Sequence, residues 1–223
     1  MTLGKLTKLS RISRRVLVRG ALASAATLAL GNSSHSACLI TPKQAEGPFY
    51  PEHVLETDWD MTKVLGGTGR ASGEVIEVIG QVRDDKCRTV GSCILEIWQA
   101  NAEGRYAHPH DFASEYPVDK NFQGYARIAT DKGGNYRFVS IIPGPYPAGG
   151  GWIRPPHIHF RVRSAFASLT TQMYFDGHEH NDHDYLLNSL DSVEERHALL
   201  VDFHQIRADG VRVGKFDLVL THD

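Results

Sequence analysis

A series of short strand-like segments is the feature that most constrains the fold of this chain. Each segment is a run of β-branched or aromatic residues, and turn signals such as residues 131–135 and 209–210 separate the runs. The runs cover residues 73–82, 94–99, 126–130, 136–142, 157–162, 169–175 and 216–221. Their lengths and spacing predict an all-β domain, a sandwich or a barrel, and we expect a β-sandwich of mostly antiparallel strands.

Helices and long loops supplement the strands. Ser192 and Glu195 form a capping box that opens a helix ending near Gln205. The segments 101–125 and 142–156 lack strand patterns and are long for a compact sandwich, where such loops are usually functional or disordered. Aromatic and charged residues are interleaved in the first of them, so we predict long, ordered loops that form the site. Together with the capped segment, we expect one or two short helices in the domain.

The first 36 residues have the pattern of an export signal. Arg14 and Arg15 precede an apolar, alanine-rich run over residues 20–31, and small residues follow it. Paired arginines specify the twin-arginine route, so we predict a signal peptide over residues 1–36 and a periplasmic or secreted mature domain over residues 37–223. The apolar run is too short to cross a bilayer, so we expect no membrane span. The alternative is an N-terminus that is basic and amphipathic by chance.

Composition narrows the classes of partner. The 223-residue chain carries a formal net charge of −2, which gives no electrostatic basis for binding nucleic acid or an anionic membrane surface. Its hydrophobic content of 41% suffices for one well-buried domain. The sequence does not decide between a monomer, a homo-oligomer and a complex with a second subunit. We therefore expect a single domain without a nucleic-acid partner.

The cysteines bear on the exported state. Cys87 and Cys93 flank a short turn between two predicted strands, and in an oxidising compartment they could form a local disulfide. Two small buried residues would give the same spacing. Cys38 follows the predicted signal, but His35 occupies the position where a lipoprotein signal requires an aliphatic residue, which disfavours lipid attachment.

A proline-rich segment leads into the strand predicted at residues 157–162. His157 and His159 are two residues apart, so their imidazoles leave the strand on one face. Tyr146 lies between two prolines, whose rings fix φ, and Arg154 precedes the histidines. This pattern suits a preformed metal site, but by themselves the two histidines are more typical of an ordinary loop and strand.

A second tyrosine gives this segment a chemical interpretation. If Tyr106, Tyr146, His157 and His159 surround one ion, that ion has two phenolate and two imidazole ligands. A phenol has a pKa of about 10, so only a strongly acidic cation keeps it ionised at neutral pH. Zn²⁺ sites use Cys, His and carboxylates, and Cu(I) prefers sulfur. The ligands therefore predict non-haem Fe(III) as the cofactor.

These motifs resemble those of the intradiol ring-cleavage dioxygenases, in particular the iron-bearing subunit of protocatechuate 3,4-dioxygenases. The similar segments are residues 98–106, 124–130, 143–147 and 154–160, with 41–50 and 171–175 in addition. The resemblance implies an enzyme that uses Fe(III) and O₂ to cleave a small aromatic diol. Oxygen would enter between the two hydroxyl-bearing carbons of a protocatechuate-like catechol, and the product would be a muconate-type dicarboxylate.

The resemblance also implies roles for individual residues. Tyr106 and His157 match equatorial iron ligands, and Tyr146 and His159 match the axial ones. Tyr146 would leave the metal and accept a proton from the catechol. Arg154 matches a catalytic residue that lies against the ring and stabilises negative charge.

Further positions bear on the substrate. Gln172 matches a catalytic position near the substrate, and Gly47 and Pro48 match residues at the mouth of the pocket. The protocatechuate enzymes have a tryptophan two residues after the axial tyrosine, where this chain has Ala148 followed by three glycines. The wall of the pocket must differ there, so the resemblance leaves the ring substituents of the substrate open.

Other interpretations compete with this enzyme. An exported β-sandwich could bind an aromatic or carbohydrate ligand without chemistry, but such a module would have no use for the four ligands and Arg154 together. A His-ligated barrel of the cupin type would leave the tyrosines unexplained. The histidines of residues 178–183 could bind zinc or copper, although we favour a solvated loop because no partner motif accompanies them.

Overall fold

The computed structural model describes residues 38–222, apart from residues 53–55, 57 and 112–114. The predicted signal peptide over residues 1–36 lies outside the described residues, so its export and cleavage stay predictions. Within the described residues, no helix has the length and apolar character needed to cross a membrane.

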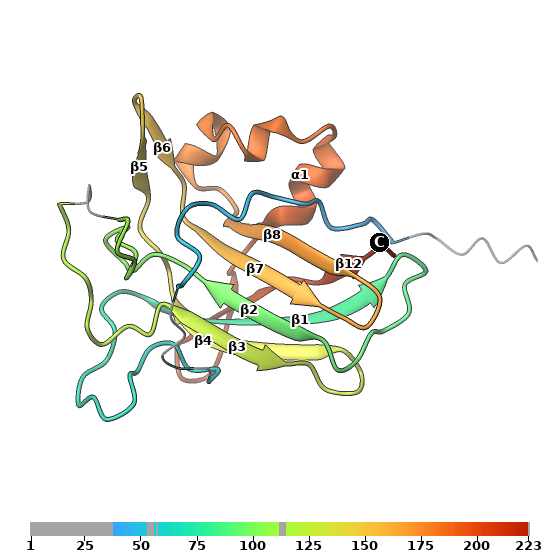
Figure 1. Ribbon diagram of the computed structural model, residues 1–223, viewed down its shortest axis with the longest axis horizontal. Coiled ribbons are helices and arrows are strands. Elements are labelled where there is room, and N and C mark those ends of the chain that lie inside the picture. The colour runs from blue at the N-terminus through green and yellow to red at the C-terminus, as the bar shows by residue number, and fades with distance from the viewer. Residues whose placement is uncertain (1–37, 53–55, 57, 112–114, 223) are drawn as a thin grey trace, which may run out of the picture. The chain divides into compact units, whose positions relative to one another are not determined.

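Two five-stranded sheets pack against each other, and a two-stranded hairpin projects beside them (Figure 1). The first sheet contains β1 (Val75–Asp84), β4 (Asn135–Ile141), β10 (Gln205–Ile206), β11 (Arg212–Lys215) and β12 (Leu218–Leu220). The second contains β2 (Ile94–Trp98), β3 (Tyr125–Ala129), β7 (His157–Arg163), β8 (Ser168–Phe175) and β9 (Leu200–Val201). The hairpin is β5 (Tyr146–Gly149) and β6 (Trp152–Arg154). The predicted β-sandwich is confirmed.

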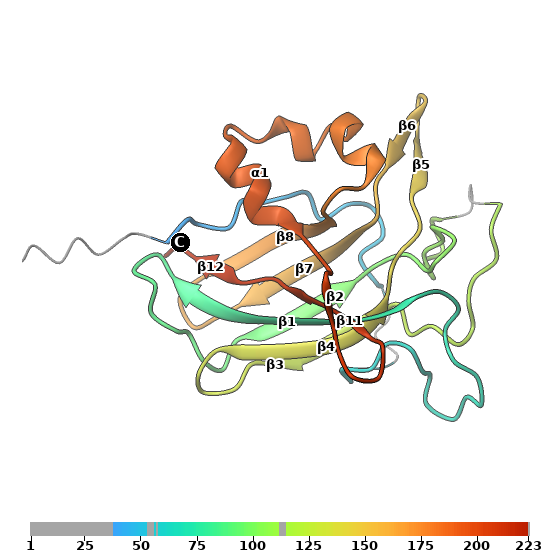
Figure 2. The ribbon, with the colours of Figure 1, turned by 180° about the vertical axis from the view of Figure 1, so that it is seen from behind.

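Antiparallel pairings predominate, as predicted. β1 pairs antiparallel with β4, and β7 pairs antiparallel with both β2 and β8. Three pairings are parallel, namely β1 with β11, β1 with β12, and β8 with β9. Figure 2, which turns the molecule by 180°, shows β1, β11 and β12 in front of the second sheet. The strand order therefore comes from long-range pairings that no local pattern specifies.

The core lies between the two sheets and follows the two-residue period of the strands. Ile76 and Val78 of β1 are fully buried, and so are Ile158, Phe160 and Val162 of β7. The residues between them in β7 point to the opposite face of the second sheet. That outer face carries the predicted site, because His157 and His159 alternate with the core residues.

The helix predicted from residue 192 begins as expected but is shorter. Ser192 caps α1 (Val193–Leu199) by accepting a hydrogen bond of 3.1 Å from the backbone N–H of Glu195. The helix does not continue to Gln205, because Leu200 and Val201 leave it to pair with β8 as β9. Two short 3₁₀ helices, η1 (Glu179–His183) and η2 (Leu187–Ser189), precede it.

Of the two possibilities left open for Cys87 and Cys93, the local disulfide does not form. Cys87 is bonded to Cys38, with a Cα–Cα distance of 5.3 Å, and Cys93 is a buried free thiol. Cys93 belongs to the buried core between the sheets, where its thiol donates to the carbonyl oxygen of Val90 (3.4 Å). Cys38 reaches that turn because the backbone N–H of Thr41 binds the carbonyl oxygen of Val219 (3.1 Å). The bond thus ties the start of the described chain to the turn after β1.

Candidate active site

Strand register assembles one half of the candidate site on the outer face of the second sheet. His157 and His159 of β7 lie on the same face because they are two residues apart. In the neighbouring strand β8, Tyr174 pairs with His157 and Gln172 pairs with His159. On the other side, Trp98 of β2 pairs with His159. Three adjacent strands therefore present their functional side chains side by side.

A close approach of two loops assembles the other half. Tyr106 follows the turn at Gly104, and Tyr146 follows Gly144 and Pro145. A Cβ atom on Gly104, whose φ is +80°, would collide with the carbonyl oxygen of Pro145. A Cβ atom on Gly144 would lie 2.5 Å from backbone atoms of the turn that contains Gly104. The two tyrosines are brought together because glycines let their loops touch backbone to backbone.

The structure places the four predicted metal ligands together. The hydroxyl oxygens of Tyr106 and Tyr146 each lie 3.5 Å from Nε2 of His157. The rings of His157 and His159 have centroids 4.9 Å apart, and the two tyrosine rings are 5.5 Å apart. Tyr106, His157 and His159 are buried, whereas Tyr146 is partly exposed. Side chains from a loop, a hairpin and β7 thus converge on one point.

Both histidines are held neutral, with defined orientations. Nδ1 of His157 donates a hydrogen bond to the carbonyl oxygen of Pro155 (2.7 Å), so the lone pair of Nε2 faces the two phenols. Burial, with the nearby Arg154 charge, holds the pKa of His157 well below its ordinary value. Burial and Arg154 also lower the pKa of His159, to about 3. The His159 ring stacks on Trp98, with centroids 4.8 Å apart.

The donor set fits a strongly acidic cation. Burial raises the pKa of Tyr106 well above its ordinary value and also raises the pKa of Tyr146, so neither phenol ionises on its own at neutral pH. Nδ1 of His159 is buried without a hydrogen-bond partner among the described residues. Across the described part of the chain, no group of three or more His, Cys, Asp or Glu side chains is arranged to hold a metal. A metal centre here has to use the tyrosines.

Arg154 provides a buried positive charge beside these four side chains. It lies on β6 directly opposite Tyr146 of β5. Its Nη2 donates to Oε1 of Gln172 (2.6 Å) and to the hydroxyl of Tyr174 (3.3 Å), and its Nε donates to Asp184 (2.8 Å). Burial alone would lower the pKa of Arg154, but Tyr174, Tyr146 and Asp184 raise it. The guanidinium therefore remains charged.

Sequence reasoning missed two of these partners, Tyr174 and Asp184. Asp184 follows the histidines of residues 178–183 and has no motif of its own. Tyr174 lies in β8 two residues after Gln172, and this spacing places both side chains on the Arg154 side of the strand. The two-residue period could have identified Tyr174, whereas only the fold brings Asp184 to Arg154.

The segment before β1 covers the site. Gly47 has a φ of +74°, and a Cβ atom there would lie 3.4 Å from Cε1 of His159. The ring of Phe49 packs on Tyr106 with centroids 4.6 Å apart, and Tyr50 meets Trp98 edge-on at 5.1 Å. Gly47 thus lies against the ring of His159.

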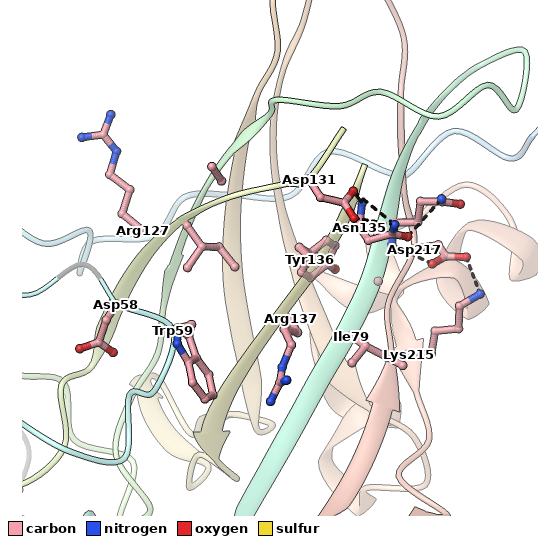
Figure 3. A pocket seen from close by; sticks show the side chains of 14 residues that line it. Asp58, Trp59, Ile79, Arg127, Asp131, Asn135, Tyr136, Arg137, Lys215 and Asp217 are labelled. Carbon is pink, nitrogen blue, oxygen red and sulfur yellow. Dashed lines mark hydrogen bonds and ion pairs between the residues drawn. The ribbon is translucent and has the colours of Figure 1, made fainter. Parts of the chain in front are cut away.

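The predicted site lies apart from a large cavity of about 1060 Å³ at the β3 and β4 side of the sandwich. Figure 3 shows that cavity, with Asp131 bound to Asn135, Lys215 bound to Asp217, and Arg127 extending away from them. None of the predicted ligands lines it. A smaller cavity, of about 70 Å³, is lined by Phe49, Trp98 and Tyr106, and of the four candidate ligands only Tyr106 borders it.

Comparisons with known proteins identify the family of this chain. The sequence model of the family described as Dioxygenase matches residues 45–222. The protocatechuate 3,4-dioxygenase beta chain of Burkholderia cepacia is 40% identical over 176 residues, which cover 70% of this chain and 74% of that protein. A chlorocatechol 1,2-dioxygenase of Pseudomonas putida is 31% identical over 160 residues, covering 65% of this chain and 55% of that protein.

Solved structures are similar in fold. The dioxygenase domain of a dioxygenase and carbohydrate-binding protein fusion from Streptomyces sp. SirexAA-E has a TM-score of 0.62 at 27% identity, covering 82% of this chain and 99% of that chain. The 3-chlorocatechol 1,2-dioxygenase of Rhodococcus opacus 1CP has a TM-score of 0.64 at 25% identity, covering 82% and 73%. The chain belongs to the intradiol ring-cleavage dioxygenase family and is an enzyme of that class.

Proposed function

We propose that this enzyme uses non-haem Fe(III) to insert both atoms of O₂ between the two hydroxyl-bearing carbons of a small catechol. The product is then a muconate-type dicarboxylate. The observation that carries the proposal is the convergence of the Tyr106 and Tyr146 hydroxyls on Nε2 of His157, with His159 alongside. Two neutral imidazoles and two phenols are a donor set that suits Fe(III) better than Zn²⁺ or Cu(I).

The four side chains would hold the ion, and Fe(III) there would supply a Lewis-acidic centre at which a catechol binds through both oxygens and becomes reactive toward O₂. His157 and His159 are the fixed anchors, since a hydrogen bond to Pro155 orients one and stacking on Trp98 orients the other. Tyr106 is equally buried, so it keeps its place during turnover.

Tyr146 is the movable side chain of the four. It is the most exposed of them and lies in the two-stranded hairpin rather than in the sandwich. Burial favours its neutral form and raises its pKa, so the Tyr146 phenolate, once displaced, accepts a proton from a catechol hydroxyl. This proton transfer to the Tyr146 oxygen removes one of the two protons that a catechol has to lose before it chelates as a dianion.

Arg154 stabilises the negative charge that this proton transfer leaves on the catechol. A fixed guanidinium in a site from which water is excluded acts more strongly than in water. Gln172 is fully buried and binds Arg154 through Oε1 and the carbonyl oxygen of Ala45 through Nε2 (2.7 Å). We therefore assign to Gln172 the task of orienting Arg154 from β8.

The ring substituents of the substrate depend on the hairpin wall. Ala148 and residues 149–151 are exposed and present no large side chain there. Curated relatives are named for protocatechuate, chlorocatechol and hydroxyquinol. We propose a protocatechuate-like catechol as substrate. We also propose export by the twin-arginine route, which moves folded proteins and so suits a cofactor that is loaded before export.

Oxygen uptake with catechol, protocatechuate and hydroxyquinol, together with identification of the products, tests the proposal. We expect uptake with at least one of them and a dicarboxylic product, in which both oxygen atoms of ¹⁸O₂ are found. A product cleaved outside the two hydroxyl-bearing carbons, or no uptake by the iron-loaded protein on any catechol, would contradict it.

A further inference from the structure

Arg154 is held at one edge by a carboxylate from a segment that the proposed chemistry does not use. Asp184 follows η1 and is fully buried, and its Oδ2 accepts the hydrogen bond from Nε of Arg154 at 2.8 Å. Arg154 itself is only 4% exposed. A buried guanidinium needs a paired, hydrogen-bonded anion, and Asp184 supplies it.

The remaining edge of the guanidinium is free. Asp184 occupies Nε, while Gln172 and Tyr174 occupy Nη2. Nη1 forms no hydrogen bond with any described residue. Because a guanidinium is planar, contacts at two of its nitrogens fix where the third points.

We propose that Asp184 is a positioning residue, which fixes the plane of Arg154 so that Nη1 is presented to the bound catechol. The inference rests on the proposed function, because only in that function does the charge of Arg154 stabilise a bound catechol. It extends that function by assigning a role to the segment between β8 and α1. The side chain of Asp184 forms hydrogen bonds with Arg154 and with the backbone of Leu187, and with none of the four candidate ligands.

The structure around Asp184 is built to hold its carboxylate still. Its second oxygen, Oδ1, accepts a hydrogen bond of 2.8 Å from the backbone N–H of Leu187. The side chain of Asn188 donates to the carbonyl oxygen of Asp184 (2.7 Å), and the side chain of Asn181 donates to Phe175 at the end of β8 (2.7 Å). Both carboxylate oxygens are thus engaged, and the segment is anchored to the second sheet.

The proposal also gives a structural role to the histidine-containing segment at residues 178–183. Those residues include η1, whose one buried residue is Asn181. No metal-holding group of His, Cys, Asp or Glu is found there or elsewhere in the described residues. In Figure 1 the helical segments after β8 lie beside the β5–β6 hairpin, and η1 contacts β6, which carries Arg154. Residues 178–183 therefore place Asp184 next to Arg154.

Asp184→Asn in the full-length, iron-loaded enzyme tests the inference, with Asp182→Asn as the matched control on the same segment. Asp182 is exposed and pairs with Arg196. We expect Asp184→Asn to keep its iron and its resting visible spectrum and to lose about 100-fold in kcat with little change in KM, because a small misplacement costs about that much. Asp182→Asn should behave as the wild type.

A double-mutant cycle separates positioning from general damage. In an Arg154→Lys background, Asp184→Asn should cause less than a threefold further loss in kcat. Lysine lacks the planar guanidinium that Asp184 orients, so the second substitution has little left to disturb. An equal loss in both backgrounds, or wild-type kcat in the single variant, would overturn the inference.

A measurement on the metal-free protein stands apart from activity and from the proposed function. The Nε–H of Arg154, assigned by its loss in Arg154→Lys, should give a slowly exchanging ¹⁵N–¹H signal in the wild type. It should exchange fast in Asp184→Asn. Fast exchange in the wild type would overturn the inference even where Asp184→Asn does not fold. If the signal is protected but the protein has no dioxygenase activity, the proposed function is refuted. The finding that Asp184 holds Arg154 in place would still stand.

Discussion

A Cβ atom on Gly144 would lie 2.5 Å from the carbonyl oxygen of Ala102, so the two loops that carry Tyr106 and Tyr146 meet without any side chain between them. The backbone N–H of Gly144 also donates to the carbonyl oxygen of Asn101 at 2.9 Å. The distance between the Tyr106 and Tyr146 phenols therefore depends on residue 144 having no Cβ methyl group.

Gly144→Ala should separate these loops and weaken metal binding. We expect the affinity for Fe(III) to fall by about 10- to 100-fold, the range seen when the support of a ligand is lost. Gly133→Ala is the matched control, because a Cβ there first meets the movable side chain of Asn135 at 3.0 Å. Titration of both metal-free variants with ferric iron measures the effect, and equal affinities would show that the contact does not set the site.

The Cys38–Cys87 disulfide should stabilise the domain. It closes a separation of 49 residues, for which the chain-entropy model gives about 4 kcal/mol of unfolding free energy, at the upper end of the typical 2–4 kcal/mol for a disulfide. Reductant should lower the Tm of the wild type by about 5–15 °C. Cys38→Ser should already have the lower Tm and should not respond to reductant. A wild-type Tm that is unaffected by full reduction would argue against a stabilising role for this bond.

Gly80 lies where β1 crosses the core, and no side chain fits there. A Cβ atom would collide with the carbonyl oxygen of Phe216 and lie 2.6 Å from the Tyr136 ring. Gly80→Ala should therefore reduce the unfolding free energy by about 3 kcal/mol, at the upper end of overpacking costs. Gly210→Ala, at an open turn position with a φ of +86°, should cost only about 1 kcal/mol. Denaturant unfolding compares the two, and similar losses would contradict the packing argument.

The side chains of the candidate site could be named from the sequence because separate motifs, together with a family resemblance, single them out. His157 and His159 share a face through the period of one strand, and the prolines around Tyr146 mark its loop. The structure adds how Tyr106 comes to them, through the close contact at Gly144. Asp184 could not be predicted, since only the packing of η1 against β6 brings it to Arg154.

The fold was predictable in class but not in its long-range pairings. The long strands have clear β patterns, whereas β9, β10 and β11 have two to four residues and exist because a longer strand pairs with them. The same reason ends α1 at Leu199. Spacing suggested the nearer cysteine for Cys87, but Cys93 faces the core and Cys38 arrives from the start of the domain.

The visible absorption spectrum of the protein titrated with ferric iron tests the central claim most directly. We predict one Fe(III) per chain and a visible tyrosinate-to-iron charge-transfer band. Tyr106→Phe and Tyr146→Phe should each alter that band, whereas Tyr116→Phe, at an exposed position, should leave it unchanged. A protein that takes up no iron, or a band that neither substitution alters, would contradict the account.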